Sequence, residues 1–190
     1  MPESLVPVPD PARYGRNDAG AGRKISRPAR TGVSAILNDV KTQGALWIRD
    51  SAPRDQIALL ALLRDLHRAE RGERGEPSDN DLLRDIERSE IFVADLDDVV
   101  IGMAAIELFD EPAYQGAEPR QRACVMAIAV AEAHRRQGVA TRLMQHVMDW
   151  LKTSEVVSIG LYVRAGNDGA RGFYEKMGFE VEALAMQRLL

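Results

Sequence analysis

The sequence predicts a single domain of the mixed α/β (α+β) class. Two amphipathic segments come first, three strand-like segments follow, and helical and strand patterns then alternate toward the C-terminus. A chain of 190 residues is long enough to bury one substantial core and too short for two ordinary domains. The hydrophobic fraction of 45% lies within the usual range of globular proteins.

The elements follow from the spacing of apolar residues, which recur every three to four positions in helices and alternate in strands. The expected helices cover residues 53–71, 78–89, 139–153 and 168–177. The expected strands cover residues 45–49, 91–94, 99–106, 122–130, 158–163 and a terminal stretch that begins at Phe179. Ser51 and Ser78 are the expected caps of the first two helices. The acidic residues 95–98 are expected to turn a hairpin, and residues 110–121 to form a polar loop.

Composition divides the chain into an N-terminal extension, residues 1–44, and a globular domain, residues 45–190. Residues 1–30 are rich in Pro, Gly, Ala and Arg and show no apolar periodicity, so we expect a largely disordered or loosely packed extension. Residues 31–43 fit a short amphipathic helix.

Charge is also distributed unevenly. The extension holds seven Lys/Arg against four Asp/Glu, whereas the domain holds eighteen against twenty-five, a net charge of −7. A domain this acidic argues against a nucleic-acid-binding face and favours a cationic partner such as an amine. Ordinary solubility explains the same charge equally well.

Several classes of protein are not expected from this sequence. Eighteen apolar residues never run together, so no membrane span is predicted, and the N-terminus lacks the basic start and apolar stretch of a secretory signal. Cys124 is the only cysteine, which fits the reducing cytoplasm. The three histidines lie far apart, so no metal site is predicted.

Residues 128–144 (IAVAEAHRRQGVATRLM) carry the first chemical signal. An apolar strand leads through a short turn into Arg135-x-x-Gly138-x-Ala140 and then into an amphipathic helix. The first turn of such a helix has backbone N–H groups without internal partners and the positive end of the helix dipole. Small residues at positions 138 and 140 let an anion approach that backbone, which predicts a pyrophosphate site. The nucleotide-binding patterns G-x-x-x-x-G-K-[ST] and G-x-G-x-x-G are both missing from the sequence.

A second motif follows at residues 167–179, Asn-Asp-Gly-Ala-Arg-Gly-Phe-Tyr-Glu-Lys-Met-Gly-Phe. Together the two motifs resemble the signatures of the GNAT superfamily of acetyl-CoA-dependent N-acetyltransferases, in the same order and at the expected separation. The strict resemblance covers about a third of the chain. It implies a GNAT-type fold, in which a mixed sheet of about six to seven strands is flanked by about four helices and splayed at the acetyl-CoA site.

The resemblance also implies roles for individual residues. The strand residues would pair through their backbone with the pantetheine arm, the turn amides would hold the pyrophosphate, and Arg135 would support that turn or add charge to it. Tyr174 would be the general acid that protonates the departing CoA thiolate, with no metal involved. The implied cofactor-binding residues are Ile128, Ala129, Val130, Arg135, Arg136, Gln137, Gly138, Val139, Ala140, Thr141, Asn167 and Tyr174.

Other interpretations of these residues remain open. Asn167 lies where a helix needs an N-cap, so capping alone explains it equally well. Tyr174 fits a half-buried core position. Arg136 and Ala140 replace glycines that are common in the family, although neither replacement removes a backbone donor.

The general base is not evident from the motifs. Acetyl transfer needs a neutral amine, and a lysine-like amine is mostly protonated at neutral pH. Several relatives supply a carboxylate or histidine from the strand before the turn, but here Arg122 and Cys124 occupy the positions where a base is expected. A lone cysteine among apolar neighbours is usually inert packing. Glu107 on the neighbouring strand is the candidate base, and burial would raise its pKa. Exposure of Glu107 to solvent, with proton loss through ordered water, is the alternative.

The sequence therefore predicts an enzyme that transfers acetyl from acetyl-CoA to a primary amine of a small molecule, by direct attack in a ternary complex. Acetylation of a protein N-terminus or lysine is one alternative, and a non-catalytic CoA-binding sensor module is another. We expect neither a nucleic-acid nor a membrane partner, and a homodimer is left open.

Overall fold

The computed structural model describes residues 45–71, 77–111, 120–184 and 186. The expected extension, its helix over residues 31–43 and most of the expected polar loop lie outside the described residues. The described residues fall into two compact units, one that ends at Tyr162 and one that begins at Val163.

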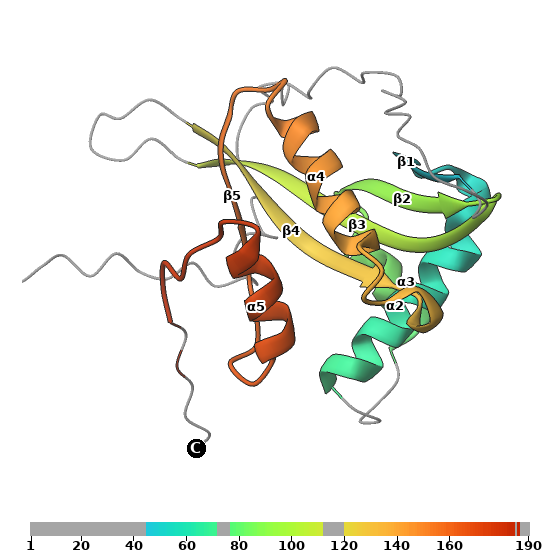
Figure 1. Cartoon of the computed structure of the whole chain (residues 1–190). Coiled ribbons are helices and arrows are strands. Elements are labelled where there is room, and N and C mark those ends of the chain that lie inside the picture. Colours follow the sequence, from blue (N-terminus) through green and yellow to red (C-terminus); the bar gives the residue numbers. More distant parts are fainter. Residues whose placement is uncertain (1–44, 72–76, 112–119, 185, 187–190) are drawn as a thin grey trace, which may run out of the picture. The chain divides into compact units, whose positions relative to one another are not determined.

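The first unit is built on a five-stranded mixed sheet with the order β1-β2-β3-β4-β5 (Figure 1). The first three pairings are antiparallel and the last, between β4 and β5, is parallel. A mixed sheet was predicted, and all five strands occur close to their expected positions. The strands are β1 (Leu46–Asp50), β2 (Glu90–Leu96), β3 (Val99–Glu111), β4 (Arg120–Val130) and β5 (Val156–Leu161).

The prediction of strands from Phe179 onward is wrong for the described part of that segment, since none of residues 179–184 and 186 belongs to a strand. The sheet therefore has five described strands rather than six to seven. Val181 and Leu184 are 63% and 80% exposed, so this segment buries no apolar face. A strand gains little stability without such a face to bury.

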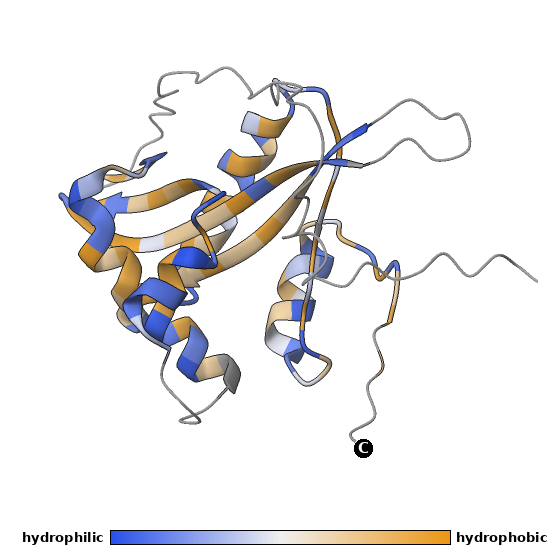
Figure 2. Ribbon diagram, turned by 180° about the vertical axis from the view of Figure 1, so that it is seen from behind, coloured by the Kyte–Doolittle hydropathy of each residue, from blue (hydrophilic) through white to orange (hydrophobic). Residues whose placement is uncertain are grey.

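The described residues form four α-helices and two short 3-10 helices, of which α5 belongs to the second unit. Helices α2 and α3 cover one face and α4 covers the other (Figure 1). Figure 2 shows central strands that are mostly hydrophobic, beside helices that mix hydrophobic and hydrophilic residues. Within the described residues, no helix is long and apolar enough to cross a membrane. The helices are η1 (Pro53–Asp55), α2 (Gln56–Arg71), α3 (Asp79–Arg84), η2 (Glu132–His134), α4 (Val139–Leu151) and α5 (Asp168–Lys176).

The predicted cap of the second helix is confirmed, and that of the first is wrong. Ser78 caps α3, where its side chain accepts a hydrogen bond from the N–H of Asp81. The first helical turn is capped at Ala52 instead of Ser51, and the Ala52 N–H donates to the Asp55 carboxylate at 2.7 Å. Asp55 can accept this bond because a buried ion pair already holds it in place.

That ion pair centres on Arg49 of β1. Its guanidinium donates to both oxygens of Asp55, at 2.7 and 3.0 Å, and twice to Asp95 of β2, at 2.9 and 2.7 Å. Both aspartates are buried, at 4% and 6% exposure. The cluster joins β1, β2 and η1, which leads into α2, at one end of the sheet.

Candidate active site

An open edge on β4 is the first feature of the site. Pairing between β4 and β5 ends at Val125 and Leu161, whereas pairing between β4 and β3 continues to Val130 and Gly102. From Met126 to Val130, β4 therefore has no strand partner on the β5 side among the described residues (Figure 1). An extended ligand could add there as a strand would.

The register decides which backbone groups face that edge. The N–H of Ala131 donates to the carbonyl of Ile101 at 2.8 Å, which fixes the phase of the β3–β4 ladder. Because backbone groups in an antiparallel pair alternate in direction, those of Ala129 face β3 and those of Ile128 and Val130 face the open edge. Of the three predicted residues, two thus present backbone groups where the pantetheine arm is expected.

A β-bulge lies where the edge opens. Ala105 pairs with Ala127 and Ile106 with Val125, so Met126 is the extra residue on β4. Met126 is 43% exposed, whereas its neighbours Val125 and Ala127 are buried. Because of the bulge, Val125 and Ala127 point to opposite faces of the sheet, although a regular strand would place them on the same face. A sequence pattern that alternates every second residue cannot reveal this change.

The turn after β4 brings backbone N–H groups together. Arg136 and Gly138 both have left-handed backbones, with φ of 60° and 81°. The N–H of Arg142 donates to the carbonyl of Gly138 at 3.0 Å, so the N–H groups of residues 138–141 precede the first hydrogen bond of α4. Such concave arrangements of N–H groups at a helix start bind anions. The backbone of residues 136–141, hereafter the cradle, fits a diphosphate.

Side chains hold the cradle in shape. The Arg135 Nε donates to the carbonyl of Val130 at 3.0 Å, and the Gln137 Nε2 donates to the carbonyl of Ala133 at 2.9 Å. Arg135 thus supports the turn, which is one of the two roles expected for it.

Gly102 of β3 keeps α4 close to the open edge. A Cβ added there would lie 3.1 Å from the carbonyl oxygen of Ala129 and 3.3 Å from side-chain carbons of both Val139 and Leu143. The lack of a side chain therefore lets the first turn of α4 pack directly on β3.

The candidate base lies beside the opening. Glu107 of β3 is opposite Cys124 of β4, one residue before Val125, where pairing with β5 ends. Because side chains alternate along β3, Glu107 shares a face with Met103 and Ala105, which belong to the core beneath α2 and α3. Sequence reasoning named both residues but could not show that they are neighbours.

The two side chains differ in what they can do chemically. Glu107 is half-buried, and this burial raises its pKa above the ordinary glutamate value, with the positive charge of Arg88 partly opposing the rise. Burial and the nearby charge of Glu107 raise the pKa of the Cys124 thiol to about 11. A thiol with that pKa is protonated at neutral pH and is a poor nucleophile, so Glu107 is the better proton acceptor.

The remaining predicted residues lie in the second unit, on α5. The Asn167 side chain accepts a hydrogen bond from the N–H of Ala170 at 3.0 Å, so capping, one of its two interpretations, is confirmed. Tyr174 is buried, with the rings of Phe173 and Phe179 at 5.1 and 5.5 Å from its own. The cradle, the open edge and Glu107 all belong to the first unit. Cofactor contact by Asn167 and proton donation by Tyr174 stay predictions.

Comparison of the sequence with models of known protein families shows which family the chain belongs to. The sequence model of the acetyltransferase (GNAT) family matches residues 60–179, which is more than half of the chain. The chain belongs to the GNAT family. Members of this family use acetyl-CoA as the acetyl donor. The open edge of β4 and the cradle that follows it fit a ligand with an extended arm and a diphosphate.

Curated GNAT relatives match over shorter stretches. The chain is 31% identical over 85 residues to the probable N-acetyltransferase san of Drosophila melanogaster, covering 44% of this chain and 43% of that protein. It is 40% identical over 57 residues to the [ribosomal protein bS18]-alanine N-acetyltransferase of Salmonella typhimurium, covering 30% and 38%. The alignments thus span about two-fifths of the length of these relatives.

Solved structures show the same fold over more of the chain. A mutant of the BH1408 protein from Bacillus halodurans aligns with a TM-score of 0.66 at 22% identity, covering 76% of this chain and 99% of that one. An aminoglycoside acetyltransferase from an uncultured soil metagenomic sample aligns with a TM-score of 0.57 at 19% identity, covering 77% and 99%. At these identities the likeness concerns the fold alone.

Proposed function

We propose that the chain transfers the acetyl group of acetyl-CoA to a primary amine of a small molecule, by direct attack in a ternary complex. The observation that carries this proposal is the continuity of the open β4 edge with the cradle. Ile128 presents its N–H and carbonyl, and Val130 its N–H, to an extended arm, and residues 136–141 follow after the short η2 turn with N–H groups for a diphosphate. Members of the family use a donor of this shape.

The chemistry needs one proton acceptor and one proton donor from the protein. Acetyl-CoA, when bound, supplies an acetyl group activated as a thioester. The amine nitrogen forms a bond to the carbonyl carbon as the carbon–sulfur bond breaks. Glu107 takes the proton that the amine loses, and Tyr174 gives its hydroxyl proton to the departing sulfur.

The acceptor is proposed to be a small amine because of charge. The domain from residue 45 onward has a net charge of −7, which attracts cationic amines from solution. Once an amine is bound, a carboxylate with a raised pKa is suited to remove its proton.

A protein N-terminus is the second candidate acceptor, and the names of the relatives favour it. They include the [ribosomal protein bS18]-alanine N-acetyltransferase and the N-alpha-acetyltransferase 30 of Schizosaccharomyces pombe. These alignments cover only 57 and 58 residues, and 30% of this chain in each case, so they leave most of the chain uncompared.

Release of free thiol from acetyl-CoA distinguishes the candidates. The purified chain is incubated with acetyl-CoA and a panel of monoamines, polyamines, aminoglycosides, amino acids and peptides. The proposal expects one or more small amines to accelerate thiol release. Acceleration by peptides alone would move the assignment to the second candidate. Binding of acetyl-CoA without acceleration by any acceptor would favour a CoA-binding sensor.

A further inference from the structure

Cations on the described helices are mostly neutralised by carboxylates nearby. Helices α2, α3, α4 and α5 each carry such a pair, formed within the helix or with a neighbouring one. The pairs are Arg64–Asp79, Arg68–Asp65, Arg84–Asp81, Lys152–Asp149 and Arg171–Glu175.

The arginines in and beside the cradle have no such carboxylate partner among the described residues, a property that they share with Arg88, Arg120 and Arg164. Arg135 and Arg142 donate to backbone carbonyls, those of Val130 and Leu46, and form no ion pair with a carboxylate of the described residues. Arg136 forms neither a hydrogen bond nor an ion pair through its side chain with any described residue. Arg135, Arg136 and Arg142 thus place three positive charges around the cradle, against the single negative charge of Glu132 in the same loop, in a chain whose net charge is −4.

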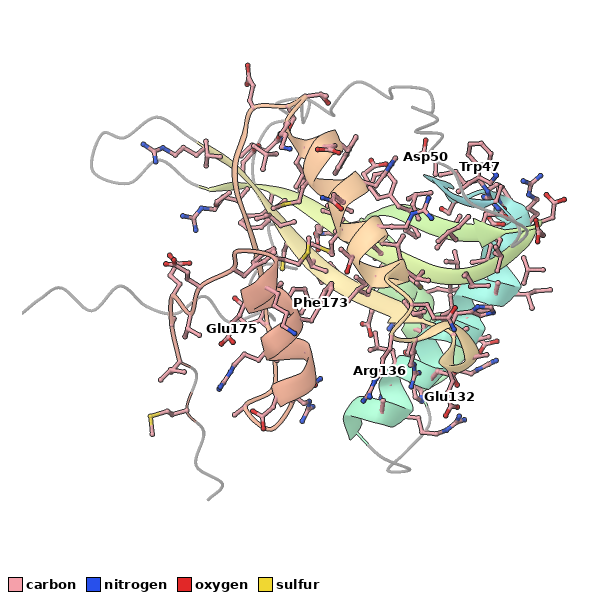
Figure 3. The ribbon with its side chains drawn as sticks, viewed as in Figure 1. Trp47, Asp50, Glu132, Arg136, Phe173 and Glu175 are labelled. Atoms are coloured by element: carbon pink, nitrogen blue, oxygen red, sulfur yellow. The ribbon has the colours of Figure 1, made fainter. Side chains whose placement is uncertain are left out.

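Arg136 is also held in an unusual backbone conformation. Its φ of 60° is one that glycine adopts freely and arginine rarely adopts. Figure 3 shows Arg136 and Glu132 projecting from the loop between β4 and α4. Both side chains are exposed, and they form no ion pair with each other. The arginine therefore keeps all its donors available for a ligand.

The proposed cofactor offers two phosphate groups of different kinds. The N–H groups of residues 136–141 already supply donors for the diphosphate. The ribose of CoA carries a separate 3′-phosphate, which is close to doubly charged at neutral pH and needs donors of its own. A guanidinium matches a phosphate in charge and in the spacing of its donors.

We propose that the Arg136 side chain binds the 3′-phosphate of CoA and makes the chain discriminate between CoA and 3′-dephospho-CoA. This inference rests on one part of the proposed function, the binding of CoA in the cradle, and does not depend on acetyl transfer. It assigns the arginine side chain a role in selecting the cofactor, separate from the role of its backbone N–H.

Calorimetric titration of the full chain with CoA and with 3′-dephospho-CoA tests the inference without relying on turnover. The wild type is expected to bind CoA at least about tenfold more tightly, the effect of one charge-assisted contact. In Arg136→Gln and Arg136→Gly this ratio should fall to nearly one, while the affinity for 3′-dephospho-CoA stays within about twofold. The glycine variant keeps the left-handed turn without strain, so it separates the side chain from the backbone. Arg120→Gln, an exposed arginine at the other end of β4, should keep the wild-type ratio.

Each other outcome overturns the inference in a different way. An unchanged ratio in both Arg136 variants would mean that the 3′-phosphate is bound elsewhere. An equal loss for both ligands would place the arginine on the diphosphate. A wild type that binds neither ligand would remove the proposed function itself, which distinguishes that failure from the other two.

Discussion

Substitution of Gly102 by alanine tests how closely β3 must approach α4. The added Cβ would lie 3.1 Å from the carbonyl oxygen of Ala129 and 3.3 Å from Val139 Cγ1 and Leu143 Cδ1. The oxygen belongs to the backbone of the β3–β4 pair and cannot easily move. Val139 and Leu143 are 4% and 0% exposed, so the first turn of α4 must shift as a unit.

The magnitude follows from two opposing effects. Inserting a methyl group into a well-packed core costs about 1–3 kcal/mol. Alanine also restricts the unfolded chain, which returns about 0.4–1 kcal/mol. Taken near the middle of these two ranges, the net loss is about 1–2 kcal/mol, and a domain of this size loses about 2–4 °C of melting temperature per kcal/mol. A fall of roughly 2–8 °C is expected, together with weaker CoA binding because the cradle moves with α4.

Thermal denaturation followed by far-ultraviolet circular dichroism measures the effect. Gly160→Ala on β5 is the matched control, because no heavy atom beyond its neighbours lies within 4 Å of an added Cβ there. The reasoning would be refuted if Gly102→Ala melted with the wild type, or if both variants lost the same amount.

Three further variants test the ion cluster and the chemistry. Arg49 holds the pKa of Asp55 below its ordinary value, so Asp55 stabilises the fold above the pKa of an unfolded aspartate, and this contribution is lost as pH falls through the lower folded value. Asp55→Asn should therefore cost about 1.5–3 kcal/mol at neutral pH and weaken the acid dependence in urea denaturation. Tyr174→Phe should lower kcat by ~10²–10⁴-fold with acetyl-CoA affinity unchanged. Glu107 must be deprotonated to act, so kcat/KM should fall as the pH is lowered, with a midpoint above the ordinary glutamate pKa. This acidic limb of the pH–rate profile should be missing in Glu107→Gln.

Contrary results would have clear meanings. Full activity of Tyr174→Phe would make Tyr174 a core residue, packed between Phe173 and Phe179. An acidic limb that persists in Glu107→Gln would show that the proton leaves through water. An Asp55→Asn variant as stable as the wild type would mean that Asp95 alone satisfies Arg49.

Local sequence signals predicted much of the fold. The acidic hairpin is a case in point, although its turn is limited to Asp97 and Asp98 because β2 continues through Leu96; both residues take left-handed conformations, with φ of 51° and 65°, that short polar residues tolerate. The start of α4 was predicted at Val139, where it occurs, because Gly138 precedes a clear helical period. In both places neighbouring residues alone determine the conformation.

The features that sequence could not predict depend on contacts between distant residues. Ala52 is the cap of the first helix because Arg49 fixes Asp55, and β2 contributes to that cluster through Asp95. The bulge at Met126 exists only in the register between β3 and β4. Strands were expected from Phe179 onward, but a local segment cannot show whether the edge of a sheet is available to pair with it.

Binding of acetyl-CoA to the wild type and to two Gly138 variants tests the central claim most directly. Gly138 has φ of 81° and no protein atom within 4 Å of an added Cβ, so a side chain there displaces nothing in the protein, and we expect it to meet the bound ligand. Asp and Asn have the same shape and both tolerate this backbone, so they differ in charge alone. The account predicts that the wild type binds, that Gly138→Asn binds more weakly, and that Gly138→Asp loses at least about tenfold more, because its carboxylate repels the diphosphate. Equal affinities for the two variants, or no binding by the wild type at millimolar acetyl-CoA, would contradict it.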